Sequence, residues 1–100
     1  MNRLTPSEVR LVEQYLSVLD YVSRCAQAVE CDDWFYLYDK SAELAVRAKR
    51  LAEVAAELWR TIDTQRRLPP RGAIAAAVAW HGRHYRVGRL LHPAAPKERR

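Results

Sequence analysis

The chain has 100 residues, of which 49% are hydrophobic and 29% are charged, and its formal net charge is +5. This length fits one domain with a modest core, and the composition favours a folded, well-solvated chain over an intrinsically disordered one. No apolar run approaches the roughly 18 residues of a membrane-spanning helix. The first residues lack the apolar stretch of a secretion signal, so we expect a cytoplasmic protein, with Cys25 and Cys31 as free thiols.

A helix is predicted over residues 6–30. Thr5 is a favourable N-cap, Pro6 suits the first helical position, and Glu8 stands three residues after Thr5, so the start has the pattern of a capping box. Apolar side chains then recur at helical spacing, at Val9, Val12, Leu16, Leu19, Val22, Ala26 and Val29. A flanking row widens this face with Leu11, Tyr15, Val18 and Cys25.

A second long helix is predicted over residues 34–67. Asp32 or Asp33 can cap its start, because a carboxylate there accepts hydrogen bonds from backbone N–H groups and favours the helix dipole. Leucines recur at seven-residue steps, at Leu37, Leu44, Leu51 and Leu58, and the positions four residues later are Ser41, Ala48, Ala55 and Ile62. Since only a short break separates the helices, the expected fold is mainly α, with two long antiparallel helices forming an αα-hairpin.

The leucine repeat has a second interpretation, a leucine zipper. Zipper transcription factors need a basic helix directly before the leucines, whereas residues 31–39 are acidic and aromatic, so the hairpin within one chain is favoured. A homodimer remains as a variant, with a second copy pairing through Leu37, Leu44, Leu51 and Leu58.

Residues 66–72 end the second helix, because they contain consecutive prolines and a glycine. The segment 73–91 that follows is either a third helix, which its alanine run favours, or a short β-hairpin with His81-Gly82 as the turn. We favour the β-hairpin, because Tyr85 and Val87 prefer strands and the pairing places apolar residues on one face.

The second helix is longer than the first, so its C-terminal end needs a cover for Leu58, Trp59 and Ile62. We expect the segment 73–91 to pack on this open end. Residues 1–92 would then form a single helical domain, and residues 93–100 a basic flexible tail.

The sequence carries no pattern typical of an enzyme. A Ser/His/Asp arrangement, a glycine-rich phosphate loop and a carboxylate pair in an evident cleft are all missing, so no catalytic residue and no cofactor are predicted, and an enzyme is only a minor alternative. The spacing of His81 and His84 occurs in metal sites, but the cysteines belong to the opposite end of the helical hairpin, so no metal site is predicted.

Residues 34–38 read Trp-Phe-Tyr-Leu-Tyr, and five consecutive large side chains cannot all face one core, since successive helical residues are about 100° apart. Exposed Trp and Tyr side chains are enriched in binding hot spots, although a plug that seals the hairpin tip explains the cluster equally well. The first hypothesis is therefore a non-catalytic interaction or regulatory module. It would bind a protein partner through its helical surface and an aromatic tip formed by Trp34, Phe35, Tyr36 and Tyr38.

Positive charge is concentrated in the last third of the chain. Residues 1–65 hold eight Lys/Arg and eleven Asp/Glu, whereas residues 66–100 hold nine Lys/Arg and only Glu98. The alternative hypothesis is nucleic-acid binding, in which arginines meet phosphates and aromatic rings stack on bases. The candidate contacts are Arg66, Arg67, Arg71, Trp80, Arg83, Tyr85, Arg86 and Arg89. An acidic protein partner, or a basic surface that only aids solubility, explains the same charges.

Overall fold

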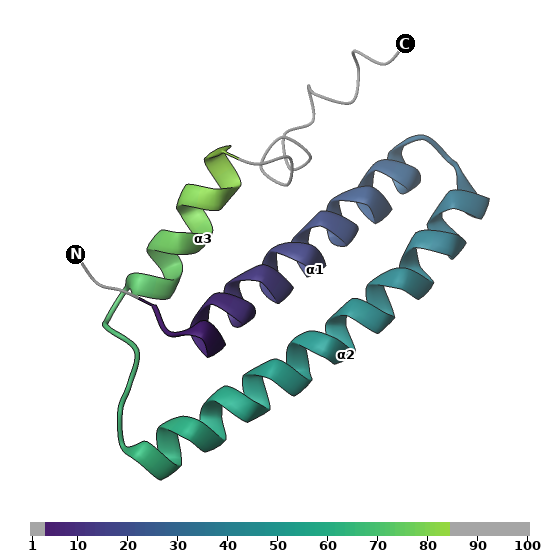
Figure 1. The fold of residues 1–100 in the computed structure, drawn as a ribbon. Helices are drawn as coiled ribbons and strands as arrows, with labels where there is room; N and C mark the ends of the chain where they lie inside the picture. Colours follow the sequence, from purple (N-terminus) through teal and green to yellow (C-terminus); the bar gives the residue numbers. More distant parts are fainter. Residues whose placement is uncertain (1–3, 85–100) are drawn as a thin grey trace.

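The computed structural model of the chain describes residues 4–84, with side chains described up to His81. In this range the chain forms three helices, α1 (Pro6–Glu30), α2 (Trp34–Gln65) and α3 (Ala73–His84). α1 and α2 are antiparallel, and α3 packs against α1 on the side away from α2 (Figure 1). α1 is therefore the central helix, and the mainly helical fold with a long αα-hairpin is confirmed.

The predicted start of α1 is confirmed in detail. Thr5 Oγ1 accepts a hydrogen bond from the Glu8 backbone N–H at 3.2 Å, and a Glu8 carboxylate oxygen accepts one from the Thr5 N–H at 2.9 Å. The break before α2 follows from Asp32, which takes a left-handed φ of 55°, and from Asp33, whose carboxylate accepts from the Tyr36 N–H at 3.0 Å. The cap of α2 is thus the second of the two aspartates considered from the sequence.

α2 ends two residues before the predicted position, at Gln65. Arg66 turns the chain with a left-handed φ of 56°, and its backbone N–H donates to the Ile62 carbonyl at 2.7 Å. A left-handed residue directly after the last turn is a common helix stop, although glycine usually occupies it. The two prolines that follow would also prevent the helix from continuing.

The hairpin core lies between α1 and α2. Among the described residues, the buried hydrophobic side chains are Val12, Leu16, Ala28, Val54 and Leu58. Leu58 is the most buried of the four heptad leucines, and Leu37, Leu44 and Leu51 are half-buried. The four heptad leucines, which we call the leucine seam, thus form part of the contact with α1 of the same chain. The described part of the molecule is elongated, 50 × 27 × 15 Å, so many apolar side chains outside this core stay exposed.

The third segment is helical over its described part, residues 73–84, which is the alternative to the favoured β-hairpin. The run of alanines from Ala73 to Ala79 explains this outcome, since alanine has the highest helix propensity and contributes little to a strand face. Residues 85–91, which would supply the second strand of the hairpin, lie outside the described residues, as does the predicted tail, 93–100.

The expected position of this segment is wrong for the part described. α3 packs against α1 rather than on the open end of α2, where Trp59 remains 64% exposed. Leu58 needs no such cover, because α1 already buries it. The linker 66–72 carries the chain back towards the N-terminal end of α1, and α3 begins there (Figure 1).

Candidate interaction surfaces

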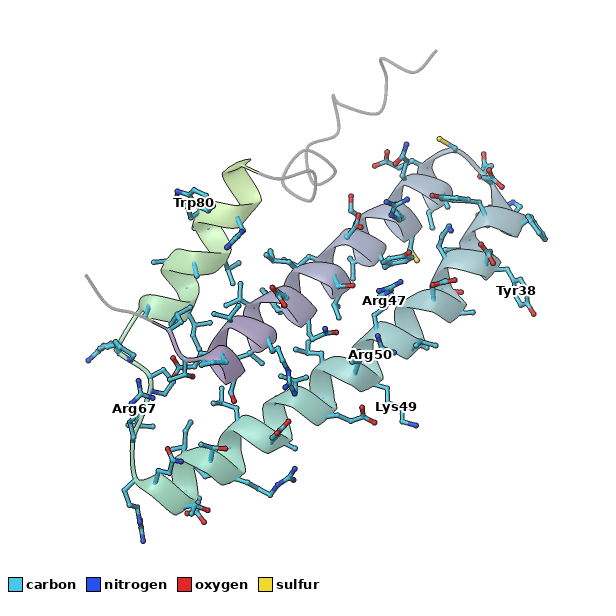
Figure 2. All side chains as sticks on the ribbon, in the orientation of Figure 1. Tyr38, Arg47, Lys49, Arg50, Arg67 and Trp80 are labelled. Atoms are coloured by element: carbon cyan, nitrogen blue, oxygen red, sulfur yellow. The ribbon has the colours of Figure 1, made fainter. Side chains whose placement is uncertain are left out.

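The aromatic tip predicted from the sequence is largely exposed. Trp34 is 58%, Phe35 80% and Tyr38 74% exposed. Trp34 and Phe35 lie in the first turn of α2, beside the break that joins it to α1, while Tyr38 points away from α1 (Figure 2). Tyr36 differs from the other three, because it is half-buried and its ring lies 5.3 Å from the Lys40 ammonium. Trp34 and Phe35 are thus the exposed pair of the aromatic tip at the end of the hairpin.

A cluster of cations around Tyr21 joins the two helices near the tip, and the sequence interpretation missed it. The guanidinium groups of Arg47 and Arg24 lie 4.6 and 5.3 Å from the centre of the Tyr21 ring, and the Lys40 ammonium lies 5.9 Å from it. Cations over an aromatic face are attracted by its negative potential. Arg47 also donates to Ser17 Oγ at 3.3 Å, so it connects α2 to α1 directly (Figure 2).

Each cation of this cluster has a carboxylate beside it. The ion pairs are Arg24–Asp20 at 3.2 Å, Lys40–Asp39 at 3.4 Å and Arg47–Glu43 at 3.7 Å. A hydrogen bond with Tyr36 raises the pKa of Arg24 above its ordinary value, against the opposing effect of partial burial and with further support from Asp20. The Glu43–Arg47 pair has the i,i+4 spacing that favours an ion pair on a helix surface. Because the charges are matched, we interpret this cluster as a clamp for the hairpin and not as an anion site.

The outer face of α2, directed away from α1, is a second exposed surface. We define it by positions spaced alternately three and four residues apart: Tyr38, Ala42, Ala45, Lys49, Ala52, Ala56, Trp59 and Asp63. All eight side chains are exposed, and Figure 2 shows Tyr38 and Lys49 pointing away from α1. The only sequence signal for this face was the repeat itself, which is difficult to recognise because four of its members are alanine.

The arginine-rich linker contains three of the predicted nucleic-acid contacts. Arg66, Arg67 and Arg71 are all exposed, but Arg67 also pairs with the buried carboxylate of Glu8 at 3.2 Å. Arg71 and Trp80, which is 46% exposed, line one open hollow together with Leu4. The Arg83 side chain and the whole of Tyr85, Arg86 and Arg89 lie outside the described residues. The structure therefore brings two of the predicted contacts, Arg71 and Trp80, to one place.

An apolar groove of about 430 Å³ runs between α1 and α3. It is lined by Leu11 and Tyr15 of α1, by Ile74 and Val78 of α3, and by Leu51 of α2. The flanking apolar row predicted on the first helix thus contacts α3 at its N-terminal end. Farther along α1, Val22 and Val29 of the main apolar stripe are 44% and 50% exposed.

Chemical sites are sparse in the described part of the chain. Between residues 4 and 84 no group of three or more His, Cys, Asp or Glu side chains could hold a metal ion. Both Cys25 and Cys31 are free. None of the described helices combines the length and the apolar content needed to cross a bilayer. Comparison with known protein families, curated proteins and solved structures finds no match for this chain.

Proposed function

We propose that this protein is a non-catalytic interaction module that binds a protein partner through its helical surface and its aromatic tip. The observation that carries the proposal is the exposure of Phe35, 80%, next to Trp34, 58%, at the end of a rigid helical hairpin. Large aromatic side chains supply much of the binding energy at protein interfaces, and they lose little conformational entropy when they bind.

The competing interpretation is a plug, in which the aromatic residues seal the hairpin and have no partner. A plug requires its side chains to be covered, and of the four aromatic residues at positions 34–38 only Tyr36 is half-buried, with its ring near Lys40. Trp34 and Phe35 project into solvent, and the break is already fixed by the Asp33 cap. The difference in exposure between Tyr36 and the pair Trp34 and Phe35 favours a binding role for the aromatic tip.

The proposal is tested by affinity purification with the full chain as bait. We expect the double variant Trp34→Ala/Phe35→Ala to recover at least about tenfold less partner than the wild type, since two hot-spot aromatics are removed. Leu68→Ala is the matched control, because Leu68 is 70% exposed but lies in the linker. Equal recovery by the double variant, with unchanged helical circular dichroism, would contradict a role for the aromatic tip.

Nucleic-acid binding through the linker is the second candidate. It is supported by the shared hollow of Arg71 and Trp80, where a guanidinium and an indole could meet a phosphate and a base. A mobility-shift titration at two salt concentrations should give a slope of about −0.9 per phosphate neutralised on duplex DNA. Arg71→Ala should reduce this slope, whereas the exposed Arg50→Ala should not. No shift with the wild type at low salt would exclude this candidate.

A further inference from the structure

Within residues 4–84, no other helix packs on the outer face of α2. Its eight positions run from Tyr38 to Asp63, about 39 Å at 1.5 Å per residue. The alternating spacing of three and four residues is that of a helix that pairs lengthwise with another helix. Two large aromatic side chains stand near the ends, Tyr38 at 74% and Trp59 at 64% exposure, and a charged residue, Lys49, stands near the middle. No described ion pair within residues 4–84 uses Lys49, Glu53 or Arg60.

The charges on this face disfavour an in-register parallel pairing with an identical helix. In a parallel pair each position meets its own copy, so Lys49 would face the second copy's Lys49, and Asp63 would face the second copy's Asp63. Like charges brought together at a helix interface are destabilising, and a lysine at one core position is known to select between pairing modes.

An antiparallel pairing brings opposite charges together instead. When the centre of the pair falls between Arg50 and Leu51, Asp39 meets the second copy's Arg60 on the rim. In the same register the Lys49 ammonium comes within reach of the second copy's Glu53. A shift by one heptad would instead place Asp39 against the second copy's Glu53, two carboxylates. Of the three arrangements compared, the charge pattern therefore favours this antiparallel register, in which the two Glu53 carboxylates offset the approach of the two Lys49 ammonium groups.

The sizes of the side chains fit the same register. Trp59 lies over the second copy's Ala42, and Ala45 lies over the second copy's Ala56. Large side chains thus meet small ones near the ends, and small meets small closer to the centre. Alanine layers allow the helix axes to approach to about 8 Å. The Tyr38 hydroxyl, at the end of the seam, can donate to the second copy's Asp63 carboxylate.

We propose that the outer face of α2 binds the same face of a second copy of this chain, antiparallel and centred between Arg50 and Leu51. The inference deepens the proposed function, on which it rests, by naming one partner of the helical surface. It moves self-association away from the leucine seam, which α1 already occupies.

Sedimentation of the full chain over a concentration series tests this pairing. The wild type should reach the mass of a dimer, and Ala56→Glu should raise the dissociation constant at least about tenfold, because a carboxylate is then buried without a partner. Ala26→Glu is the matched control, since Ala26 is also an exposed helical alanine but belongs to the apolar side of α1. A monomeric wild type at all concentrations, or a dimer that Ala26→Glu disrupts and Ala56→Glu does not, would overturn the proposal.

A charge swap tests the direction and the register. Asp39→Arg and Arg60→Asp should each weaken the dimer about threefold to tenfold, because each places like charges on the rim twice per dimer. The double variant should restore the wild-type dissociation constant. In a parallel dimer residues 39 and 60 lie about 31 Å apart, at 1.5 Å per residue, and no restoration would occur. A double variant as weak as the singles would therefore contradict the antiparallel register.

These outcomes are independent of the test of the aromatic tip. Loss of partner recovery in Trp34→Ala/Phe35→Ala with an unchanged dimer mass would support the tip and leave the pairing intact. A monomeric wild type that still recovers its partner would overturn the pairing and leave the proposed function standing.

Discussion

The two sides of α2 differ in what they contact, although both repeat with nearly the same period. The inner side buries Val54 and Leu58 against α1 and places Arg47 over the Tyr21 ring. The outer side carries Tyr38 and Trp59, which stay mostly exposed. The inner side therefore decides the fold of one chain, and the outer side is available for contacts with another. A helix can therefore carry a regular repeat of exposed positions that no stripe of large hydrophobic side chains marks in the sequence.

The largest expected effect is on the free energy of unfolding, and it distinguishes Leu58 from its neighbour Trp59 in α2. Leu58→Ala should lower the free energy of unfolding by about 3 kcal/mol, because a buried leucine leaves a cavity in the hairpin core. Trp59→Ala should change it by less than about 0.5 kcal/mol, since an exposed side chain loses few contacts. Urea unfolding followed by helical circular dichroism measures both.

This measurement is best made in the Ala56→Glu background, where the proposed self-association should be absent and unfolding should report on the single chain. If Trp59→Ala lowers the free energy of unfolding as much as Leu58→Ala in that background, Trp59 packs within the chain. The two sides of α2 would then not differ in the way described. If Trp59→Ala matters only when Ala56 is unchanged, the outer side contributes through the second copy alone.

A smaller effect should distinguish two arginines on α2. Arg47→Ala should lower the free energy of unfolding by about 1 kcal/mol, because it removes the contact with the Tyr21 ring and the hydrogen bond to Ser17. Arg50 is exposed and makes neither contact, so Arg50→Ala should leave the unfolding midpoint unchanged. Equal midpoints for the two variants would mean that the cation cluster does not stabilise the hairpin.

The hairpin itself could be predicted from local signals. The capping box of Thr5 and Glu8 and the Asp33 cap fix the starts of α1 and α2, because each satisfies backbone N–H groups that would otherwise lack partners. The end of α2 was harder to place, since Arg66 takes the left-handed conformation without being glycine. Boundaries set by side-chain caps are visible in a sequence, and those set by backbone conformation alone are less so.

The position of α3 and the candidate surfaces could be predicted only in part. The preference of Tyr85 and Val87 for strands outweighed the alanine run in the sequence interpretation, whereas residues 73–84 are helical. Packing against α1 depends on the path of the linker 66–72, which no residue periodicity encodes. Helical geometry indicated that the large side chains of residues 34–38 cannot all face one core, but not which of them are exposed. The outer face of α2 was missed because its alanines also fit an ordinary solvated side.

The pair formed by Glu8 and Arg67 joins positions 59 residues apart and has a consequence for anything that binds the linker. Glu8 is 1% exposed, and Arg67 is the one described cation paired with it. A phosphate or carboxylate that drew Arg67 away would leave the buried Glu8 carboxylate without its counter-charge, which is costly. Binding of an anionic ligand at the linker would therefore destabilise the first turn of α1. Conversely, an intact N-terminal cap would disfavour binding of that ligand.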